Sequence, residues 1–480
     1  MRSIVRNVVP AMLAVTVGLA LAPASGAVTQ TPSQDMAPQT VRISIARTGE
    51  PNDISGRSSR PAVSTTGKVV AFDSIATNLV RRDTNRDMDV FVRDRTTDKT
   101  ERVSVSSSGQ QANGDSTRPS VSGDGDLVGF DSGATNLVAG DTNHLMDVFV
   151  HVRDSGETIL VSRGRNSEPA NGPSFGPAVS QDGRYVAFPS DATNLVSTTV
   201  PEFDRQVYLR DLLSGTMEVV SLTTEDEPAG GGAASPAVSE DARYIAFSSF
   251  ASDVVPGDTN GAFDVFMRDR LLGVTTRVSV ASGGVQAEDG ASFSPSISAD
   301  GRFVAFASEA TNLVPADTNG VRDIFVHDNQ TGTTERVSVG PGGIQSDNQS
   351  NGPGFRGGTA FGPSISADGR YVAFDSIATN LVTGDTNTCS FDGGPSFPDA
   401  GECPDIFVRD RTLDVTTRVS VSSAGAQSND ASTDPAISFD GRSVAFFTAA
   451  SNLVAGDTNT CPPFFFGHPG QCPDIYLHRR

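Results

Sequence analysis

A single phrase recurs seven times along the 480-residue chain, and this repetition constrains the fold more than any other feature. Each copy begins with Pro, continues through Ser and, in most copies, an Asp-Gly turn, and ends in an apolar run that closes with Phe. The copies start at Pro61, Pro119, Pro177, Pro236, Pro295, Pro363 and Pro435, so neighbouring copies are 58, 58, 59, 59, 68 and 72 residues apart. A period of this length indicates stacked supersecondary units and is too long for a β-helix.

Each copy contains four short runs that are rich in Val, Ile, Phe and Thr and are separated by turn residues, so each is predicted to form four strands. In the first complete copy we expect these strands at residues 62–64, 69–73, 90–93 and 101–105. Both faces of the strands carry apolar residues, which fits sheets that stack face to face. Four-stranded units repeated four to eight times are typical of a β-propeller.

The two ends of the repeat array complement each other. The last copy contains three strands and ends with a third strand expected at 474–478, whereas residues 41–46 match the fourth-strand pattern and precede the first copy. We therefore predict an all-β, seven-bladed propeller with four-stranded blades, formed by residues 41–480 as a single domain. Pairing of 41–46 with 474–478 is expected to close the ring, which removes the exposed sheet edges.

The first 27 residues have the pattern of a secretory signal peptide. Arg2 and Arg6 precede a largely apolar run at 7–21, and small residues at 25–27 provide a cleavage site. We expect cleavage after Ala27, a flexible leader over 28–40, and no membrane span in the mature chain. The protein is therefore predicted to be secreted, periplasmic or associated with the cell envelope.

Charge narrows the class of partner. A formal net charge of −21 and a pI near 4.6 argue against nucleic acid and anionic membrane surfaces, because phosphate binding needs a basic face. We expect a monomer whose partner is an extracellular protein, peptide or glycan.

At the turn between the first two strands, the sequence resembles the TolB-type, WD40-like (PD40) propeller repeat of exported bacterial proteins. The shared pattern is a serine, an Asp-Gly turn, a basic residue and an apolar-Ala-Phe strand, as in residues 298–306. The chain departs from it where a Pro commonly stands between Ser and Asp, and it has no Trp-Asp dipeptide because it contains no Trp. The resemblance covers essentially the whole mature chain and implies a propeller and an exported setting, but propellers serve binding, scaffolding and catalysis alike.

Variation in loop length concentrates on one face of the predicted ring. The loops from strand two to strand three, and from strand four to the next blade, emerge on the same face and include the long segments 340–361, 385–404 and 457–473. Two of these loops contain the four cysteines, which we expect to pair as Cys389 with Cys403 and Cys461 with Cys472. Zinc bound by all four thiolates is the alternative, and the absence of close C-x2-C spacings argues against it.

Aromatic residues are frequent in the same two loops. They are Phe391 and Phe397 in the first loop and Phe464, Phe465 and Phe466 in the second. These rings could form a contact patch for a partner or a sugar, or they could pack over the rim and the mouth of the channel.

The triplet Asp-Thr-Asn occurs in six of the seven copies, usually with a further Asp at a fixed step. The candidate calcium ligands are Asp83, Asn85, Asp87, Asp89, Asp141, Asn143, Asp147, Asp258, Asn260, Asp264, Asp317, Asn319 and Asp323. Alternating carboxylate and amide oxygens suit Ca²⁺, and the first copy offers four ligands by itself. Repetition in nearly every blade favours the other interpretation, in which these side chains brace the loop through hydrogen bonds.

The sequence contains no convincing catalytic motif. Residues 172–176 formally match a nucleophile elbow around Ser174, but no helix follows and a Pro precedes the Ser, so we interpret the match as chance. The five histidines, His144, His151, His327, His468 and His478, show no spacing typical of a metal cluster or a relay. We therefore expect a non-catalytic binding scaffold that uses its long-loop face. The alternatives are a propeller enzyme of the lyase or glycosidase type with a metal-assisted site at the central channel, and a purely structural envelope protein.

Overall fold

The computed structural model describes residues 37–46, 57–202, 204–350, 362–388, 402–457, 460–461 and 470–480, with Asn166, 460–461 and 470–471 described by backbone alone. Contacts divide the chain into Met1–Ala37 and Pro38–Arg480, and the second unit carries the fold. The predicted signal peptide and nearly all of the predicted leader lie outside the described residues. No helix long and apolar enough to cross a membrane occurs within the described ranges.

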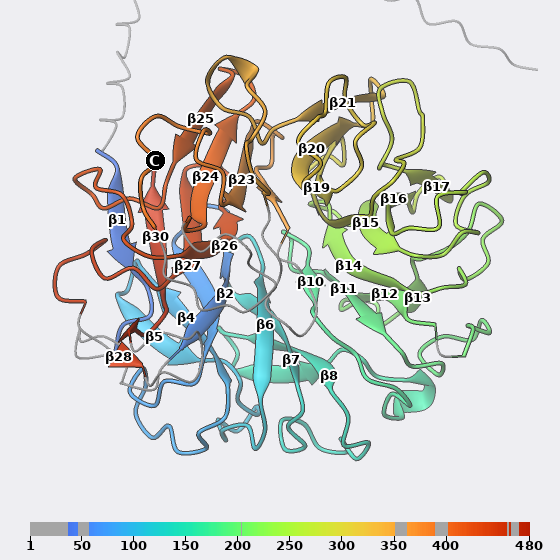
Figure 1. Ribbon diagram of the computed structural model, residues 1–480. Helices are drawn as coiled ribbons and strands as arrows, with labels where there is room; N and C mark the ends of the chain where they lie inside the picture. Colours follow the sequence, from blue (N-terminus) through green and yellow to red (C-terminus); the bar gives the residue numbers. More distant parts are fainter. Residues whose placement is uncertain are drawn as a thin grey trace, which may run out of the picture. The chain divides into compact units, whose positions relative to one another are not determined.

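Seven four-stranded antiparallel sheets form the blades of a β-propeller, which confirms the predicted fold (Figure 1). Blade 1 contains β2 (Ser58–Val63), β3 (Val69–Ser74), β4 (Asp89–Asp94) and β5 (Lys99–Arg102). Blade 2 contains β6 (Ser116–Val121), β7 (Leu127–Ser132), β8 (Asp147–Val152) and β9 (Glu157–Leu160). Blade 3 contains β10 (Ala178–Val179), β11 (Tyr185–Ser190), β12 (Gln206–Asp211) and β13 (Met217–Val219). Blade 4 contains β14 (Ala233–Val238), β15 (Tyr244–Ser249), β16 (Asp264–Asp269) and β17 (Val274–Arg277).

The remaining blades follow the same order. Blade 5 contains β18 (Ser292–Ile297), β19 (Phe303–Ser308), β20 (Asp323–Asp328) and β21 (Thr333–Arg336). Blade 6 contains β22 (Ser364–Ile365), β23 (Tyr371–Ser376), β24 (Asp405–Asp410) and β25 (Val415–Arg418). Blade 7 contains β26 (Ser432–Ile437), β27 (Ser443–Thr448), β30 (Asp474–Arg479) and β1 (Gln39–Arg42). The described chain also includes the short ladder of β28 (Thr460–Cys461) with β29 (Gly470–Gln471), and the 3-10 turns η1 (Arg165–Ser167) and η2 (Pro341–Gly343).

The ring closes as predicted, through the first strand of the chain. β1 lies beside β30 in Figure 1, and their register runs from Gln39 opposite Arg479 to Arg42 opposite Tyr476. The strand is shorter than the predicted 41–46 and begins earlier, because the backbone turns after Arg42. The N–H groups of Ile43 and Ser44 both donate to the carbonyl of Ile475, at 2.7 and 3.4 Å.

The fourth strand of blade 1 departs from its prediction for the same reason. It covers Lys99–Arg102 rather than 101–105, and the N–H groups of Val103 and Ser104 both donate to the carbonyl of Val90. Ser104 then donates from its hydroxyl to Asp89 at 2.5 Å and accepts from the N–H of Val90 at 3.1 Å. This side-chain bridge ends the backbone ladder at Arg102. The pattern of apolar residues alone predicts that the ladder continues beyond it.

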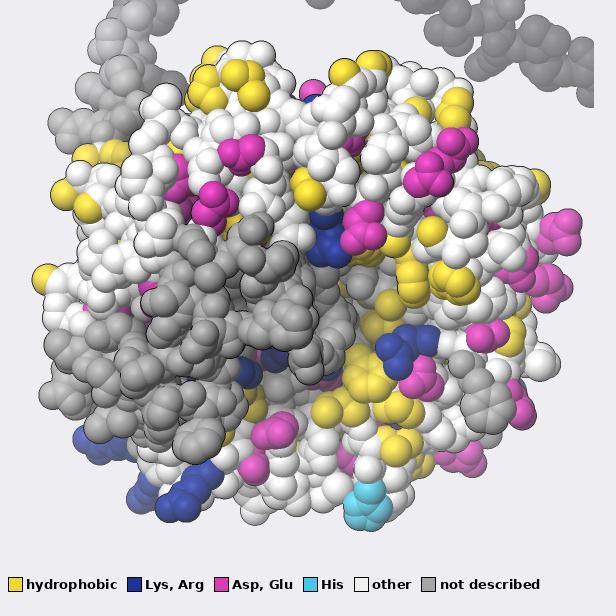
Figure 2. All heavy atoms as spheres, in the orientation of Figure 1, with side chains coloured by type: hydrophobic (Ala, Val, Ile, Leu, Met, Phe, Trp, Pro, Cys, Tyr) yellow, Lys and Arg dark blue, Asp and Glu magenta, His cyan; other side chains and the backbone are white. Residues whose placement is uncertain are grey.

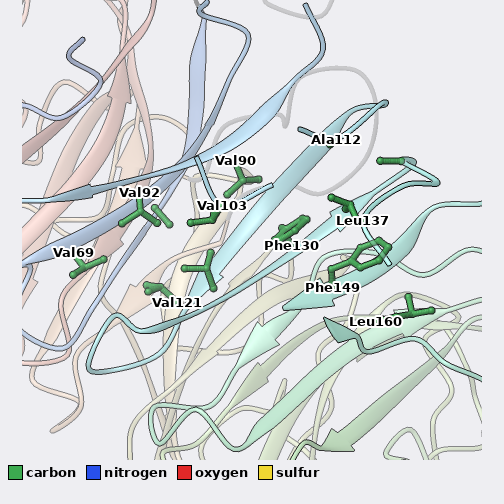
Figure 3. Packing of buried hydrophobic residues seen from close by; sticks show 13 residues of the cluster. Val69, Val90, Val92, Val103, Ala112, Val121, Phe130, Leu137, Phe149 and Leu160 are labelled. Atoms are coloured by element: carbon green, nitrogen blue, oxygen red, sulfur yellow. The ribbon is translucent and has the colours of Figure 1, made fainter. Parts of the chain in front are cut away.

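Apolar contacts between neighbouring blades form the core. Within each blade, an aromatic residue on the second strand stacks on one on the third, such as Phe130 on Phe149 at 5.9 Å between ring centroids. Figure 3 shows this pair facing Val90, Val92 and other aliphatic residues of blade 1. Each blade therefore covers the face of the blade before it, as the apolar character of both strand faces predicts.

Candidate functional site

A ring of seven dipeptides surrounds the central channel. Each consists of a variable residue followed by the Pro that opens the repeat, and together they line a hollow of about 330 Å³: Arg60-Pro61, Arg118-Pro119, Gly176-Pro177, Ser235-Pro236, Ser294-Pro295, Gly362-Pro363 and Asp434-Pro435. In blades 1, 2, 4, 5 and 7 each dipeptide takes the third and fourth positions of the innermost strand, and in blades 3 and 6 it directly precedes that strand. The repeat thus keeps the Pro for its scaffold and changes the residue that faces the axis.

The variable residues are held in an unusual backbone conformation. The register of the first two strands shifts at this point, for example between Ser59 and Ala62, which marks a β-bulge. Arg60, Arg118, Ser235, Ser294 and Asp434 have φ between 51° and 57°, although a residue before Pro normally prefers an extended conformation. Backbone strain of this kind persists where the surrounding structure enforces it and is concentrated at functional sites.

One side of the hollow is lined by ion pairs. Arg60 contacts Asp73 at 3.1 Å, and Arg118 contacts Asp131 at 2.6 Å. Both carboxylates are fully buried, and each also accepts a backbone N–H from the next blade: Asp73 from Arg118 at 3.2 Å, and Asp131 from Gly176 at 2.8 Å. These aspartates therefore fix the arginines and join blades 1, 2 and 3 around the channel.

Asp434 adds an acid of different character to this side. Loss of water around the group, followed by the nearby charge of Asp375, raises the pKa of Asp434 well above its usual range, and Arg60 opposes the shift. Burial also lowers the pKa of the neighbouring Arg57. The polar side thus contains one carboxyl group that retains its proton more readily than an ordinary aspartate.

Aromatic rings adjoin two of the lining residues in sequence, because Phe175 precedes Gly176 and Phe293 precedes Ser294. Phe175 lies under the guanidinium groups of Arg205 and Arg118, at 4.7 and 5.9 Å from its centroid, and Phe293 lies under that of Arg322 at 4.4 Å. A second cavity of about 680 Å³ lies between blades 3 and 4 and includes Phe263 and the Arg205–Asp191 ion pair in its wall. In Figure 2 hydrophobic side chains line the hollowed centre of this face, with basic and acidic side chains at its edge.

Sequence reasoning did not identify this site, although a signal was present. Comparison of the seven copies shows Arg, Arg, Gly, Ser, Ser, Gly and Asp before the shared Pro. A position that varies among the copies while the next residue is constant indicates a side chain that the scaffold does not require. Here that position is the residue that faces the axis.

The structure assigns most of the predicted calcium ligands to a bracing network. In blade 1, Arg102 contacts Asp83 and Asp89 at 3.2 and 3.1 Å, and the amide of Asn85 donates to Asp89 at 3.1 Å. Blade 5 repeats this arrangement with Arg336 between Asp317 and Asp323, while Asn319 donates to Asp323. Blade 4 does so with Arg277 between Asp258 and Asp264, while Asn260 donates to Asp264. Asp87 lies outside the network, near Asp115, whose charge adds to desolvation in raising the pKa of Asp87.

Blade 3 shows how the network looks without charge. Gln206 replaces the final Asp, and it accepts from the Ser221 hydroxyl at 2.7 Å and donates to the carbonyl of Ala229 at 2.8 Å. Among the described residues, no group of three or more His, Cys, Asp or Glu side chains is arranged to hold a metal ion. Calcium binding by these loops stays a prediction.

The predicted aromatic patch cannot be placed. Phe391, Phe397, Phe464, Phe465 and Phe466 all lie outside the described residues. The same holds for Cys389 and for the side chain of Cys461, whereas Cys403 and Cys472 are buried. The backbone of Cys461 is paired with Gly470, close in sequence to Cys472, and no free cysteine occurs in the described part of the chain. The two disulfides stay predictions.

Three residues of types common in catalysis, Ser174, His151 and His327, have structural partners. Ser174 is fully buried and donates to the hydroxyl of Ser190 at 2.8 Å, which supports the interpretation of its motif as chance. His151 and His327 are buried, and each contacts a threonine hydroxyl on the adjacent strand at 2.9 and 2.8 Å. Burial lowers the pKa of both imidazoles, so they are neutral at pH 7.

No family model matches the sequence, and no curated protein matches it. Solved structures do match. An oligogalacturonate lyase from Vibrio parahaemolyticus aligns with 92% of this chain and 97% of its own, at 13% identity and a TM-score of 0.50. TolB from Acinetobacter baumannii aligns with 77% of this chain and 65% of its own, at 14% identity and a TM-score of 0.38. Pyrococcus horikoshii acylaminoacyl peptidase aligns with 88% of this chain and 52% of its own, at 11% identity and a TM-score of 0.46. These likenesses show the fold alone.

Proposed function

We propose that the protein is an exported, non-catalytic binding scaffold that takes up an extended peptide segment of a partner protein at the mouth of its axial channel. The observation that carries the proposal is the hollow lined by the Arg60–Asp73 and Arg118–Asp131 pairs, next to the ring of Phe175, which stacks on Arg118 and Arg205. A peptide offers both kinds of contact, because its carbonyl, amide and charged groups suit the ion pairs while apolar side chains suit the rings.

The dimensions of the site support a segment rather than a folded domain. Cavities of about 330 and 680 Å³ lie in the range of ligand pockets, and the consecutive residues Ala234 and Ser235 line the two in turn. An extended chain of a few residues spans both. Because the ion pairs hold the arginines in place before binding, little side-chain entropy is lost when a ligand arrives.

The test is selection of peptides from a random 12-residue library on the full chain, followed by titration of the selected peptides. Phe175→Ala is expected to weaken binding at least tenfold. The control is Leu413→Ser, which changes a side chain 65% exposed on the turn between the third and fourth strands, at the opposite end of its blade. Equal affinity of Phe175→Ala and the parent protein would contradict the proposed site.

The second candidate is a propeller enzyme of the lyase or glycosidase type with a metal-assisted site at the central channel, and one observation favours it. Burial and the charge of Asp375 raise the pKa of Asp434, so this carboxyl retains a proton more readily near a second carboxyl, a combination suited to general acid catalysis. Incubation with acidic and neutral polysaccharides, with and without divalent cations, tests this candidate by the release of new chain ends. Product formed by the parent protein and lost in Asp434→Asn would establish the enzyme and refute the non-catalytic scaffold.

A further inference from the structure

The bracing network lacks its arginine in blades 2 and 3 of the described structure, and blade 2 is the one of these two that keeps both carboxylates. In blades 1, 4, 5, 6 and 7 of the described structure, one arginine contacts both the Asp of the triplet and the Asp that opens the third strand. These arginines are Arg102, Arg277, Arg336, Arg418 and Arg42, with contact distances from 2.9 to 3.8 Å. Each guanidinium thus balances part of the charge of two buried carboxylates.

Blade 2 retains both carboxylates and lacks the arginine. The register that places Arg102 opposite Phe91 places Leu160 opposite Phe149, so a buried apolar side chain occupies the arginine position. Blade 3 also lacks the arginine, with Val219 opposite Tyr208, but there Gln206 has replaced the buried Asp. Blade 3 therefore loses both signs of charge, whereas blade 2 loses the positive charge alone.

A second partner of the triplet Asp is also missing in blade 2. In blades 4, 5 and 6 a glutamine amide donates to this Asp, as Gln345 does to Asp317 at 2.7 Å. That glutamine bridges to the end of the preceding strand, and the matching bridge in blade 2 joins Arg163 to Pro169. Proline has no side-chain amide, so Asp141 has neither of the two donors that its counterparts use.

Asp141 consequently carries a buried oxygen without a partner. The residue is 7% exposed, and its Oδ1 atom is buried and accepts no hydrogen bond. Asp147 is fully buried and accepts from the Ser162 hydroxyl at 2.6 Å and from the Asn143 amide at 2.7 Å. No guanidinium is among the groups acting on these two carboxyls in the described structure, and the base that acts on Asp141 is the exposed His144. Asp141 accepts the backbone N–H of Asn143, but its buried Oδ1 atom without a partner is costly, so a bound cation would stabilise this arrangement.

We propose that blade 2 contains a calcium site between Asp141 and Asp147, at the place where the other blades hold a guanidinium. Two carboxylates balance one divalent ion, and their oxygen atoms are the hard ligands that Ca²⁺ selects. Ca²⁺ tolerates an irregular shell completed by water, whereas Mg²⁺ requires near-octahedral geometry, so the site should prefer calcium. The triplet loops of the other blades need no ion, because an arginine already fills that role in each of them. This includes blade 1, where the sequence alone favours calcium most.

The experiment uses the full chain after chelation, with CaCl2, MgCl2 and NaCl as probes. Calorimetric titration and thermal unfolding are the readouts. We expect one Ca²⁺ per chain and a higher Tm with calcium. Leu160→Arg supplies the guanidinium that the other blades carry, so it should weaken calcium binding at least tenfold and raise the Tm of the calcium-free protein. Asp141→Asn should weaken binding to the same degree, and it preserves the shape of the side chain.

Two matched variants serve as controls. Leu272→Arg adds the same charge at an exposed turn, and Asp154→Asn removes one exposed carboxylate elsewhere in blade 2, so both should bind calcium like the parent chain. A flat titration with an unchanged Tm would overturn the proposal, as would unchanged binding by Asp141→Asn. If the calcium-free chain is instead stabilised by lowering the pH alone, with no response to calcium, a shared proton and not an ion balances the two carboxyls.

Discussion

Closure of the ring depends on a buried serine that links residues 430 positions apart, and its removal should open the first strand selectively. The Ser44 hydroxyl donates to Asp474 at 2.5 Å and accepts the N–H of Ile475 at 3.0 Å. Both Ser44 and Asp474 are fully buried. Ser44→Ala therefore removes a hydrogen bond to a charged group, of about 1.5–3 kcal/mol, and leaves a buried N–H without an acceptor, at about 1–3 kcal/mol.

Water can reach an opened β1 and recover part of this loss, so we expect a net change of about 2–4 kcal/mol in the free energy of opening β1. That change corresponds to a roughly 30- to 900-fold fall in protection against hydrogen exchange. The readout is the amide of Ile43, which donates to the carbonyl of Ile475 at 2.7 Å. The opening of β1 breaks that bond and the Ser44 bridge together.

Ser279→Ala in blade 4 is the matched control. Ser279 is fully buried, donates to Asp264 at 2.5 Å and accepts from the N–H of Val265 at 3.0 Å. This variant should lower the Tm to a similar extent but leave protection of the Ile43 amide unchanged, because opening β1 does not break the blade 4 bridge. Equal protection of Ile43 in Ser44→Ala and the parent would refute the energetic reasoning. Equal loss in both variants would show that β1 opens only when the whole ring unfolds.

Three further predictions concern a buried histidine, a glycine in a turn and the four cysteines. Burial lowers the pKa of the folded His478 imidazole to about 4 at its contact with Thr40 of β1, whereas the unfolded chain takes up this proton below pH 6.5. About 3 kcal/mol of stability, present above pH 6.5, is therefore lost as the pH falls to about 4. Hydrogen exchange at β1 should report this loss, and His478→Asn should abolish it. Gly301→Ala should lower the Tm more than Gly320→Ala, because both glycines have positive φ but an added Cβ at Gly301 would lie 2.1 Å from the Tyr244 ring whereas Gly320 has open space; equal shifts would contradict this. Peptide mapping without reduction should recover Cys389 linked to Cys403 and Cys461 linked to Cys472, and any crossed pair would show the assignment to be wrong.

The ring, the number of blades and the closing strand could be predicted from the sequence because they depend on repetition. Every copy repeats the same apolar strands, and an error in one copy is corrected by the others. Strand ends were less predictable. At Ser104 a side-chain hydrogen bond to Asp89 ends the fourth strand, and apolar periodicity does not report where a serine finds a buried carboxylate.

The candidate site was harder to predict for a related reason. Arg60, Arg118 and Asp434 meet at the axis from blades far apart in the sequence, and nothing in their local sequence indicates convergence. The ligand spacing of the calcium pattern is best in blade 1, but the residue that contacts Asp83 and Asp89 there, Arg102, lies on another strand. A sequence shows where ligands are spaced well, but it shows less readily which of them already have a counterion.

The long separation between β1 and its partner also governs the order in which the chain can fold. Ser44 and Asp474 are 430 residues apart, so at typical rates of synthesis β1 waits about 20 to 90 s before β30 exists. During that interval blades 1 to 6 can assemble in order, each on the one before, while the first strand remains an unpaired β-segment. Holding β1 free of other sheets during this wait is a kinetic requirement that the finished ring does not display.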